Sequence, residues 1–195
     1  MMDKEVRSLQ QSESLKVLSD ADLKVSGYAL KFNTLSQDLG GFYETIPSGT
    51  INEGHLADVR LLLNHDRSQV LARTKSGTMN VKLDEVGLYF EARLPNTPQG
   101  NAVYESLKRG DLDGCSFEMG VIEDSWSKDP VTGAYIRTIK KIDEIREISI
   151  ETFPAYADTE IKLEVAQRSL NKYRDYEKDL LLLQIEMELA SMEEP

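Results

Sequence analysis

The chain has 195 residues, of which 40% are hydrophobic and 29% are charged, and this fits one globular domain with residues left for an extension. Its formal net charge of −11 argues against nucleic-acid binding, which needs a basic surface, and against binding to anionic membranes. No apolar run approaches the roughly 20 residues of a membrane span, and the N-terminus lacks the apolar core of a secretory signal.

In chain order, residues 1–23 are polar with scattered leucines, which predicts a mobile or peripheral lead-in. Alternating apolar residues bounded by turn residues predict strands over residues 24–32, 59–65, 79–83, 88–94, 117–126, 134–142 and 145–152. Residues 42–46 form a further, short strand-like run. About seven strands with few helices favour a closed or nearly closed β-barrel over a parallel sheet.

Two helices are expected. Thr97 is a suitable N-cap, Pro98 suits the first helical position and Gly110 suits the C-terminal end, so the first helix spans residues 98–109. From Ile161 to the end of the chain, apolar residues recur at helical spacing along a narrow seam. Such a helix either binds a partner or packs back on its own barrel. The chain thus divides into a lead-in of residues 1–23, a barrel domain of residues 24–160 and a helical extension of residues 161–195.

Cysteine and histidine are scarce. Cys115 is alone, so no disulfide forms within the chain, as suits a reducing cytoplasm. Two histidines and one cysteine give poor support for a zinc site, and the acidic residues near Asp111 do not match a calcium-binding EF-hand loop. We therefore expect no metal and no cofactor.

A base, a nucleophile and a carboxylate lie on three predicted strands, which is how a hydrolase site is assembled. His65 ends an apolar run and is a candidate general base, because a neutral imidazole accepts a proton near pH 7. Ser116 is the candidate nucleophile, although it lacks close glycines on both sides. Glu147 is the candidate orienting carboxylate, and strand alternation places it on the same face as Ser149 and Glu151.

The other reactive side chains near these positions are weaker candidates. If Ser116 faces the site, then Cys115 faces the core as a small apolar residue. Asp66 is adjacent to His65 and would point away from it on a strand. His55 lies in a polar stretch. Arg146, or backbone amides near Ser116, could stabilise an oxyanion, and the sequence does not choose between them.

Several ordered motifs in residues 24–160 resemble the prohead proteases of tailed bacteriophages, typified by that of phage HK97 and related in fold to the herpesvirus assemblins. The matching stretches are Gly27-Tyr28-Ala29 with Phe32-Asn33, Leu39 to Glu44, Leu63-Asn64-His65-Asp66, Gly110 to Phe117, and Glu147-Ile148-Ser149 with Phe153 to Tyr156.

The resemblance implies a serine endopeptidase with a seven-stranded barrel surrounded by helices. It places the histidine at His65 and the nucleophile at Ser116. The third position falls on Glu147, with Glu144 and Glu151 as alternatives, because no histidine exists downstream. It also implies capsid maturation inside the procapsid, in the host cytoplasm, where the enzyme removes the scaffolding segment of the major capsid protein and digests itself.

Two other functions compete with this interpretation. The acidic charge and the C-terminal helix suit a non-enzymatic scaffold or assembly module that has kept the barrel. An esterase using the same serine and histidine is a weaker alternative, because the glycine pattern of a nucleophile elbow is missing. As a partner of the C-terminal helix we expect either the scaffold or a second copy of the chain.

Overall fold

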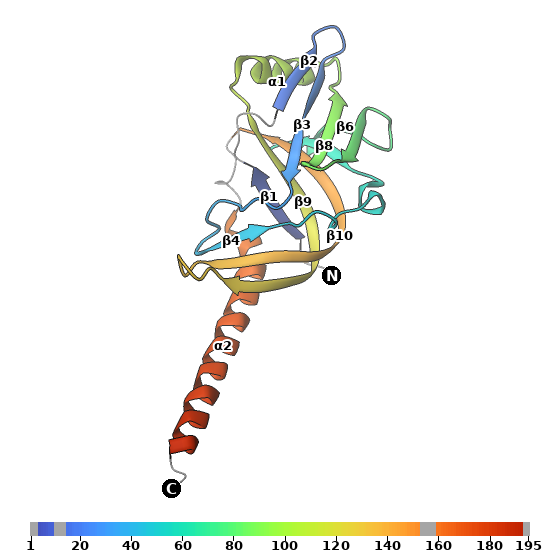
Figure 1. Ribbon diagram of the computed structural model, residues 1–195. Coiled ribbons are helices and arrows are strands. Elements are labelled where there is room, and N and C mark those ends of the chain that lie inside the picture. Colours follow the sequence, from blue (N-terminus) through green and yellow to red (C-terminus); the bar gives the residue numbers. More distant parts are fainter. Residues whose placement is uncertain (1–3, 10–14, 153–158, 193–195) are drawn as a thin grey trace.

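The structure is a computed structural model that describes residues 4–9, 15–152 and 159–192 (Figure 1). Strands are the most common element in the described residues, which also contain two α-helices and one short 3-10 helix. In chain order the elements are β1 Lys4–Leu9, β2 Leu15–Ser19, β3 Lys24–Lys31, β4 Phe42–Thr45, η1 Glu53–Leu56, β5 Arg60–Leu63, β6 Asp66–Arg73, β7 Met79–Leu83, β8 Gly87–Arg93, α1 Pro98–Arg109, β9 Gly114–Lys128, β10 Tyr135–Glu151 and α2 Thr159–Met192.

The strands form two sheets. The larger has the order β1-β9-β10-β5-β6, with β4 paired to another part of β10, and the smaller has the order β2-β3-β8-β7. The long β9–β10 hairpin is antiparallel, whereas β4 and β5 both run parallel to β10. Asp129 begins the hairpin turn, and its carboxylate accepts backbone hydrogen bonds from Val131 and Thr132. This hairpin is the centre of the larger sheet.

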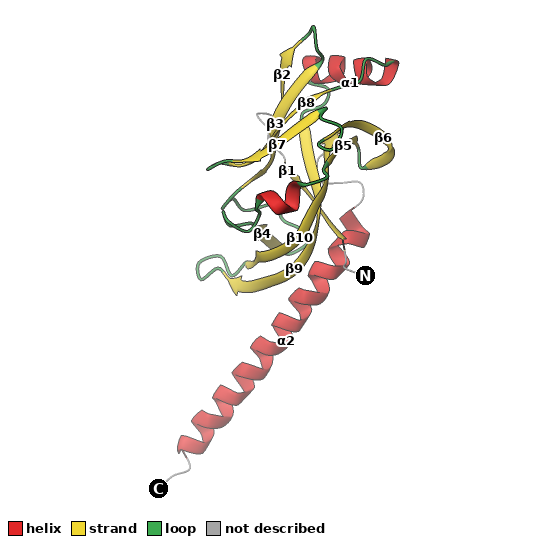
Figure 2. Cartoon of the chain, turned by 90° about the vertical axis from the view of Figure 1, so that its right-hand side faces the viewer, coloured by secondary structure: helices red, strands yellow, loops and turns green. Residues whose placement is uncertain are grey.

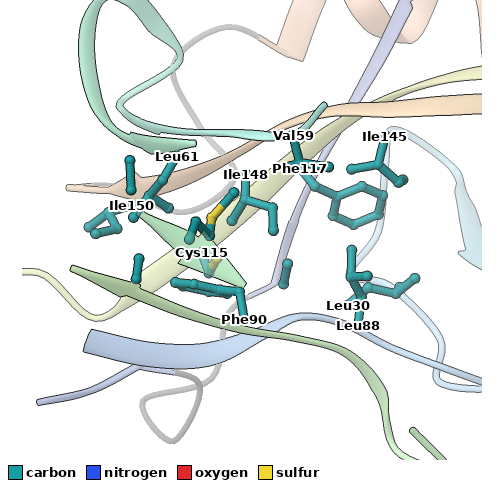
Figure 3. Packing of buried hydrophobic residues seen from close by; sticks show 14 of the residues in the cluster. Leu30, Val59, Leu61, Leu88, Phe90, Cys115, Phe117, Ile145, Ile148 and Ile150 are labelled. Atoms are coloured by element: carbon teal, nitrogen blue, oxygen red, sulfur yellow. The ribbon is translucent and has the colours of Figure 1, made fainter. Parts of the chain in front are cut away.

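The hydrophobic core lies between the two sheets (Figure 3). Leu30, Leu88 and Phe90 project from β3 and β8 toward the larger sheet. Opposite them are the core-facing residues of β9, β10 and β5, namely Cys115, Phe117, Ile145, Ile148, Ile150 and Leu61, all at most 1% exposed. Because these residues alternate along each strand, their neighbours lie on the other face of the larger sheet. That other face carries the polar residues described below.

The mixed α+β class is confirmed, but the closed seven-stranded barrel is not. Ten strands are present in the described residues, and their hydrogen bonds join them into two sheets rather than one ring. The strands expected at residues 134–142 and 145–152 are one strand, β10, because register shifts between Ile139 and Glu147 bend it without ending it. The N-terminal segment contributes β1 and β2, and both lie at a sheet edge.

Helix α1 begins and ends where the sequence predicts. The Thr97 side chain accepts a hydrogen bond from the Gly100 amide at the N-terminus. At the other end Gly110 adopts a φ of 78°, a left-handed conformation that glycine takes at little cost. The chain then passes directly into β9, so the helix fixes the start of the strand that carries Ser116.

The long helix α2 both packs on the domain and extends beyond it. Ala166 and Leu170 are fully buried against Phe42 of β4, with Trp126 and Tyr135 beside them. Past Glu177, whose carboxylate accepts a hydrogen bond from Tyr135, the helix projects away from the sheets (Figure 2). Several large apolar side chains are exposed there, namely Leu180, Leu181, Leu182, Leu183, Ile185, Met187 and Leu189. No helix in the described ranges is long and apolar enough to cross a membrane.

A buried cluster of charged residues joins β4, β9 and β10 close to helix α2. The Arg137 guanidinium on β10 lies 3.1 Å from the Glu44 carboxylate on β4 and 2.6 Å from the Asp124 carboxylate on β9. Arg137 and Glu44 are each only 2% exposed. The hydroxyl of Ser169 on α2 donates to the same Asp124, so the cluster ties three strands to the helix. Removing one member would leave a buried charge without compensation.

We therefore expect Arg137→Met to lower the free energy of unfolding by about 3–5 kcal/mol, because Glu44 would stay buried without its counter-ion. Urea denaturation followed by circular dichroism measures this change. Arg109→Met is the matched control, since Arg109 pairs with Asp111 at 66% exposure and should cost less than about 1 kcal/mol. Equal losses in the two variants would contradict the role of the buried cluster.

Candidate active site

The outer face of β9 and β10 carries a compact group of buried polar residues. Ser116 and Glu118 of β9 alternate with the core residues Cys115 and Phe117, as strand geometry requires. The prediction that Cys115 faces the core is therefore confirmed. Burial also raises the pKa of its thiol, so the thiolate that a cysteine nucleophile needs is disfavoured. Ser116 is itself fully buried, on the opposite face.

A local irregularity in β10 aims Glu147 at this group. Ile145 pairs with Met119, and Glu147 pairs with Glu118, so Arg146 is an extra residue in β10 at this point. Ile145 and Glu147 consequently face opposite sides of the sheet although they are two residues apart. Beyond the bulge, alternation places Ser149 and Glu151 on the same face as Glu147, as the sequence predicts.

His65 lies in a turn and not at the end of a strand. Leu63 of β5 pairs with Asp66 of β6, and the two residues between them have positive φ angles of 50° for Asn64 and 58° for His65. This is the geometry of a two-residue hairpin turn, and asparagine and histidine tolerate it better than most residues. The Asn64 side chain bonds both the hydroxyl and the backbone amide of Thr152, which fastens the turn to the end of β10.

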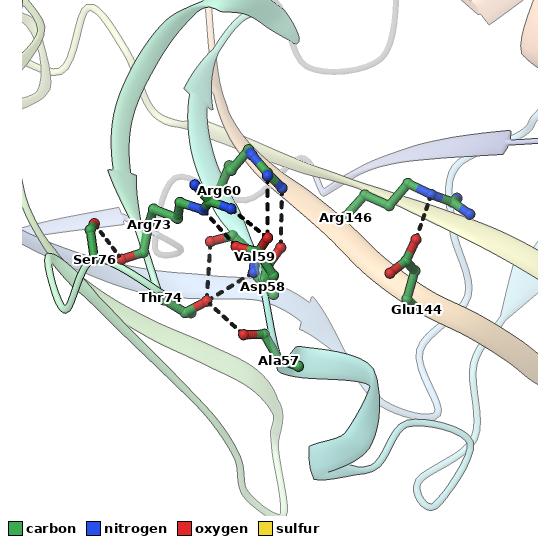
Figure 4. A network of polar contacts seen from close by, with 9 residues as sticks. All are labelled: Ala57, Asp58, Val59, Arg60, Arg73, Thr74, Ser76, Glu144 and Arg146. Carbon is green, nitrogen blue, oxygen red and sulfur yellow. Dashed lines mark hydrogen bonds and ion pairs between the residues drawn. The ribbon is translucent and has the colours of Figure 1, made fainter.

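An arginine clamp at the other end of the β5–β6 hairpin keeps the two strands in register (Figure 4). Both carboxylate oxygens of Asp58 lie 2.6 Å from the Arg73 guanidinium, and Arg60 approaches one of them at 3.2 Å. The hydrogen bonds from Arg73 lower the pKa of Asp58 to about 2, against a smaller opposing effect of burial. Since Arg60 pairs with Glu147 in the β5–β10 register, the clamp also fixes β5 beside the site.

The imidazole of His65 is bound from β10. Its Nδ1 contacts the Glu147 carboxylate in a short hydrogen bond. Ser149 supports both partners, because its hydroxyl donates to the second Glu147 oxygen at 2.6 Å and accepts the His65 backbone N–H at 3.1 Å. The orienting contact predicted for Glu147 is therefore present in the structure. Ser149 is fully buried, so these bonds are shielded from water.

Glu151 approaches the same imidazole from its other nitrogen. One carboxylate oxygen of Glu151 lies 2.7 Å from Nε2 of His65. Nε2 is buried and has no aligned hydrogen-bond partner among the described residues, so this contact is an ion pair with imperfect hydrogen-bond geometry. Burial alone would lower the pKa of His65, but the hydrogen bond with Glu147 and the close carboxylate of Glu151 outweigh it. Together they raise that pKa from 6.5 to about 9.

Ser116 lies next to this cluster through strand pairing. It is directly opposite Ser149 in the β9–β10 register, where side chains on one face have Cβ atoms roughly 4.5–5.5 Å apart. Ser149 in turn contacts both His65 and Glu147. The three residues that the sequence selected are thus gathered on one face of the larger sheet, from β9, β10 and the β5–β6 turn.

The remaining candidates lie elsewhere or have other partners. The carboxylate of Asp66 binds Ser68 and Gln69, and the imidazole of His55 accepts the Asn52 amide in a capping box of η1. Glu144 is 59% exposed and pairs with Arg146, so of the two alternative carboxylates only Glu151 reaches His65 (Figure 4).

Arg146 binds Asp143 and Glu144 beside the bulge. These contacts tie its guanidinium to its own strand, and a role for it as an oxyanion donor stays a prediction. Asn64 and Ser149 also contribute to the site, although no role was predicted for them from the sequence. Two features of the sequence could have indicated them. The Asn-His pair between two apolar strands indicates a hairpin turn, and the two-residue spacing from Glu147 puts Ser149 on the same face.

We expect Ser149→Ala to destabilise the protein by about 1–3 kcal/mol, because it leaves a buried Glu147 oxygen without its donor and the His65 amide without its acceptor. Urea denaturation measures the change. Ser76→Ala removes an exposed serine bonded only within its own turn and should stay within about 0.5 kcal/mol of the parent. A Ser149 variant as stable as this control would contradict the bonding described here.

Comparison with known proteins identifies the family of this chain. The family model for the Caudovirus prohead serine proteases matches residues 9–176, and the chain belongs to this family. It is therefore grouped with the serine proteases of tailed-phage proheads. No match is found among curated proteins. Among solved structures, the bacteriophage T4 capsid assembly protease gp21 aligns at 14% identity with a TM-score of 0.48, covering 75% of this chain and 97% of that one.

Proposed function

We propose that this chain is the serine endopeptidase of a phage procapsid, which cleaves the scaffolding segment of the major capsid protein and also cleaves itself. It would act inside the procapsid, in the host cytoplasm. Family membership supports the protease class. The observation that carries the assignment of residues is the imidazole of His65 bound by Glu147 beside Ser116, with Ser149 linking them.

In this mechanism Ser116 Oγ attacks the carbonyl carbon of the scissile peptide bond. His65 accepts the hydroxyl proton at Nε2 and then donates it to the leaving amine, which breaks the C–N bond and leaves an acyl ester on Ser116. Glu147 holds Nδ1–H, so it orients the ring and stabilises the imidazolium. Water then attacks the ester with His65 again as base, and Ser116 is regenerated. Backbone amides near Ser116, or Arg146, are the proposed oxyanion donors.

Adjacent residues on β9 give a matched test of the nucleophile. Ser116→Ala should abolish cleavage of a co-expressed capsid protein, with a loss on the order of 10⁴-fold or more, and His65→Ala should do the same because members of a triad fail together. Cys115→Ala should retain cleavage, since that side chain faces the core.

Gel electrophoresis of the co-expressed proteins, and labelling by a serine-directed phosphonate, measure these outcomes. Cleavage that survives Ser116→Ala but is lost in a folded Cys115→Ala variant would transfer the nucleophile role to the cysteine. Thermal denaturation of both variants distinguishes loss of chemistry from loss of folding.

A non-enzymatic assembly module is the second candidate. The net charge of −11 and the exposed apolar residues on the projecting part of α2 favour it. In that case the wild-type chain would neither react with a phosphonate nor cleave itself in concentrated solution, although it would still enter procapsids.

We also propose that the part of α2 beyond Glu177 binds a partner, either the scaffold or a second copy of the chain. Deleting residues 178–195 keeps the buried contacts of Ala166 and Leu170, so thermal stability should change little. Incorporation into procapsids should fall several-fold, because exposed apolar residues that would contact the partner are lost.

A full-length variant with Leu181→Gln and Leu183→Gln separates the effect of apolar surface from that of length and should show the same defect. Quantitative immunoblotting of purified procapsids measures incorporation, and sedimentation velocity tests self-association. Normal incorporation of both variants would refute a docking role for this segment.

A further inference from the structure

Two carboxylates, rather than one, hold the imidazole of His65. We infer that Glu151 is a positioning residue that keeps His65 protonated in the resting enzyme and so sets the pH above which the enzyme acts. This inference rests on the proposed function, in which His65 is the general base. Glu147 already supplies the orienting contact to Nδ1, so the contact of Glu151 with Nε2 needs a separate explanation.

The geometry itself favours the doubly protonated ring. A neutral imidazole has one N–H donor and one acceptor nitrogen, whereas the imidazolium has two donors. Glu147 and Glu151 place a carboxylate oxygen at each ring nitrogen, and both are less than 10% exposed. Exchanging the two nitrogens by a ring flip gives the same result. Glu147 and Glu151 are four residues apart on a part of β10 without register shifts, and each contacts a different nitrogen of the ring.

The other charges around His65 do not cancel this pair. On β9, Glu118 faces the same side, and the Arg67 guanidinium from β6 lies 3.6 Å from it. On β5, Arg60 is opposite Glu147 in register but is bound to Asp58. On β6, Asp66 is bound to Ser68 and Gln69. Among the side chains that the structure describes, the acidic groups on the His65 side of the sheet are therefore Glu147 and Glu151 of β10 and Glu118 of β9, with Arg67 and Arg60 as the nearby basic groups.

Burial by itself lowers the pKa of His65, but Glu147 and Glu151 together raise it to about 9. A general base must be neutral to accept the Ser116 proton, so most molecules are inactive near neutral pH while both carboxylates are in place. The same carboxylates stabilise the imidazolium that forms during attack. Removing Glu151 should therefore have opposite effects at low and at high pH.

The two-histidine composition makes a direct test simple. In a Ser116→Ala background, ¹⁵N-detected or long-range ¹H–¹⁵N NMR follows the titration of His65, and only one other histidine, His55 of η1, has to be assigned. Glu151→Gln should lower the His65 pKa by about one unit or more. Glu151→Asp keeps the charge and should keep most of the elevation. Glu144→Gln, on the same strand but paired with Arg146, should leave the titration unchanged.

The activity arm uses cleavage of a capsid-derived peptide between pH 5 and 10. Glu151→Gln should shift the acidic limb of kcat/KM to lower pH by the same amount as the NMR titration and lower the alkaline plateau. A merely structural role for Glu151 would reduce kcat/KM at every pH without shifting the limb.

The NMR titration and the cleavage assay test different claims, so a negative result in one does not decide the other. An unchanged His65 titration in folded Glu151→Gln, or an equal shift in Glu144→Gln, overturns the inference whether or not the chain cleaves peptides. Persistent cleavage by Ser116→Ala overturns the proposed function instead, and it leaves the titration result standing. If Glu151→Gln does not fold, the inference stands or falls on Glu151→Asp, whose titration must stay well above the ordinary histidine value.

Discussion

The antiparallel pairing of β9 with β10 is the constraint on which the rest of the site depends. It sets Ser116 opposite Ser149, and it lets alternate residues divide between the core and the outer face. A single extra residue, Arg146, reverses that division within β10, so that Ile145 enters the core and Glu147 reaches the outer face. Without the bulge, one of these two residues would lie on the wrong side of the sheet.

The charged side chains around His65 are largely buried. His65, Glu147 and Glu151 have side chains about one-tenth exposed or less, so their attraction is screened little by solvent. Such an arrangement links stability to pH. The elevated folded pKa of His65 means that the ion pairs stabilise the protein fully below about pH 6.5, and that this contribution is lost as the pH rises through about 9. The neutral His65 that the proposed mechanism requires and the maximal stability of these ion pairs therefore fall in different pH ranges.

Helix α2 packs against β4 and the part of the β9–β10 hairpin that carries Asp124 and Arg137, and then leaves the domain. Its buried residues Ala166 and Leu170 pack on β4, and Ser169 bonds Asp124, which also binds Arg137. Farther along, the helix leaves the sheets and presents apolar side chains to solvent (Figure 2). The expectation that the helix packs on its own domain holds for its first part, whereas partner binding stays a proposal for the part that projects.

The local elements and the candidate site residues could be predicted from the sequence alone. Capping residues located α1, alternation separated Cys115 from Ser116, and the scarcity of histidine selected His65. These signals depend only on neighbours along the chain. Three features could be seen only in the folded chain: the division of the strands into two sheets, the turn that contains His65, and the contact of Glu151 with the second ring nitrogen. Each of these depends on pairing between distant strands, and a one-residue bulge or a two-residue turn changes that pairing with little trace in the sequence.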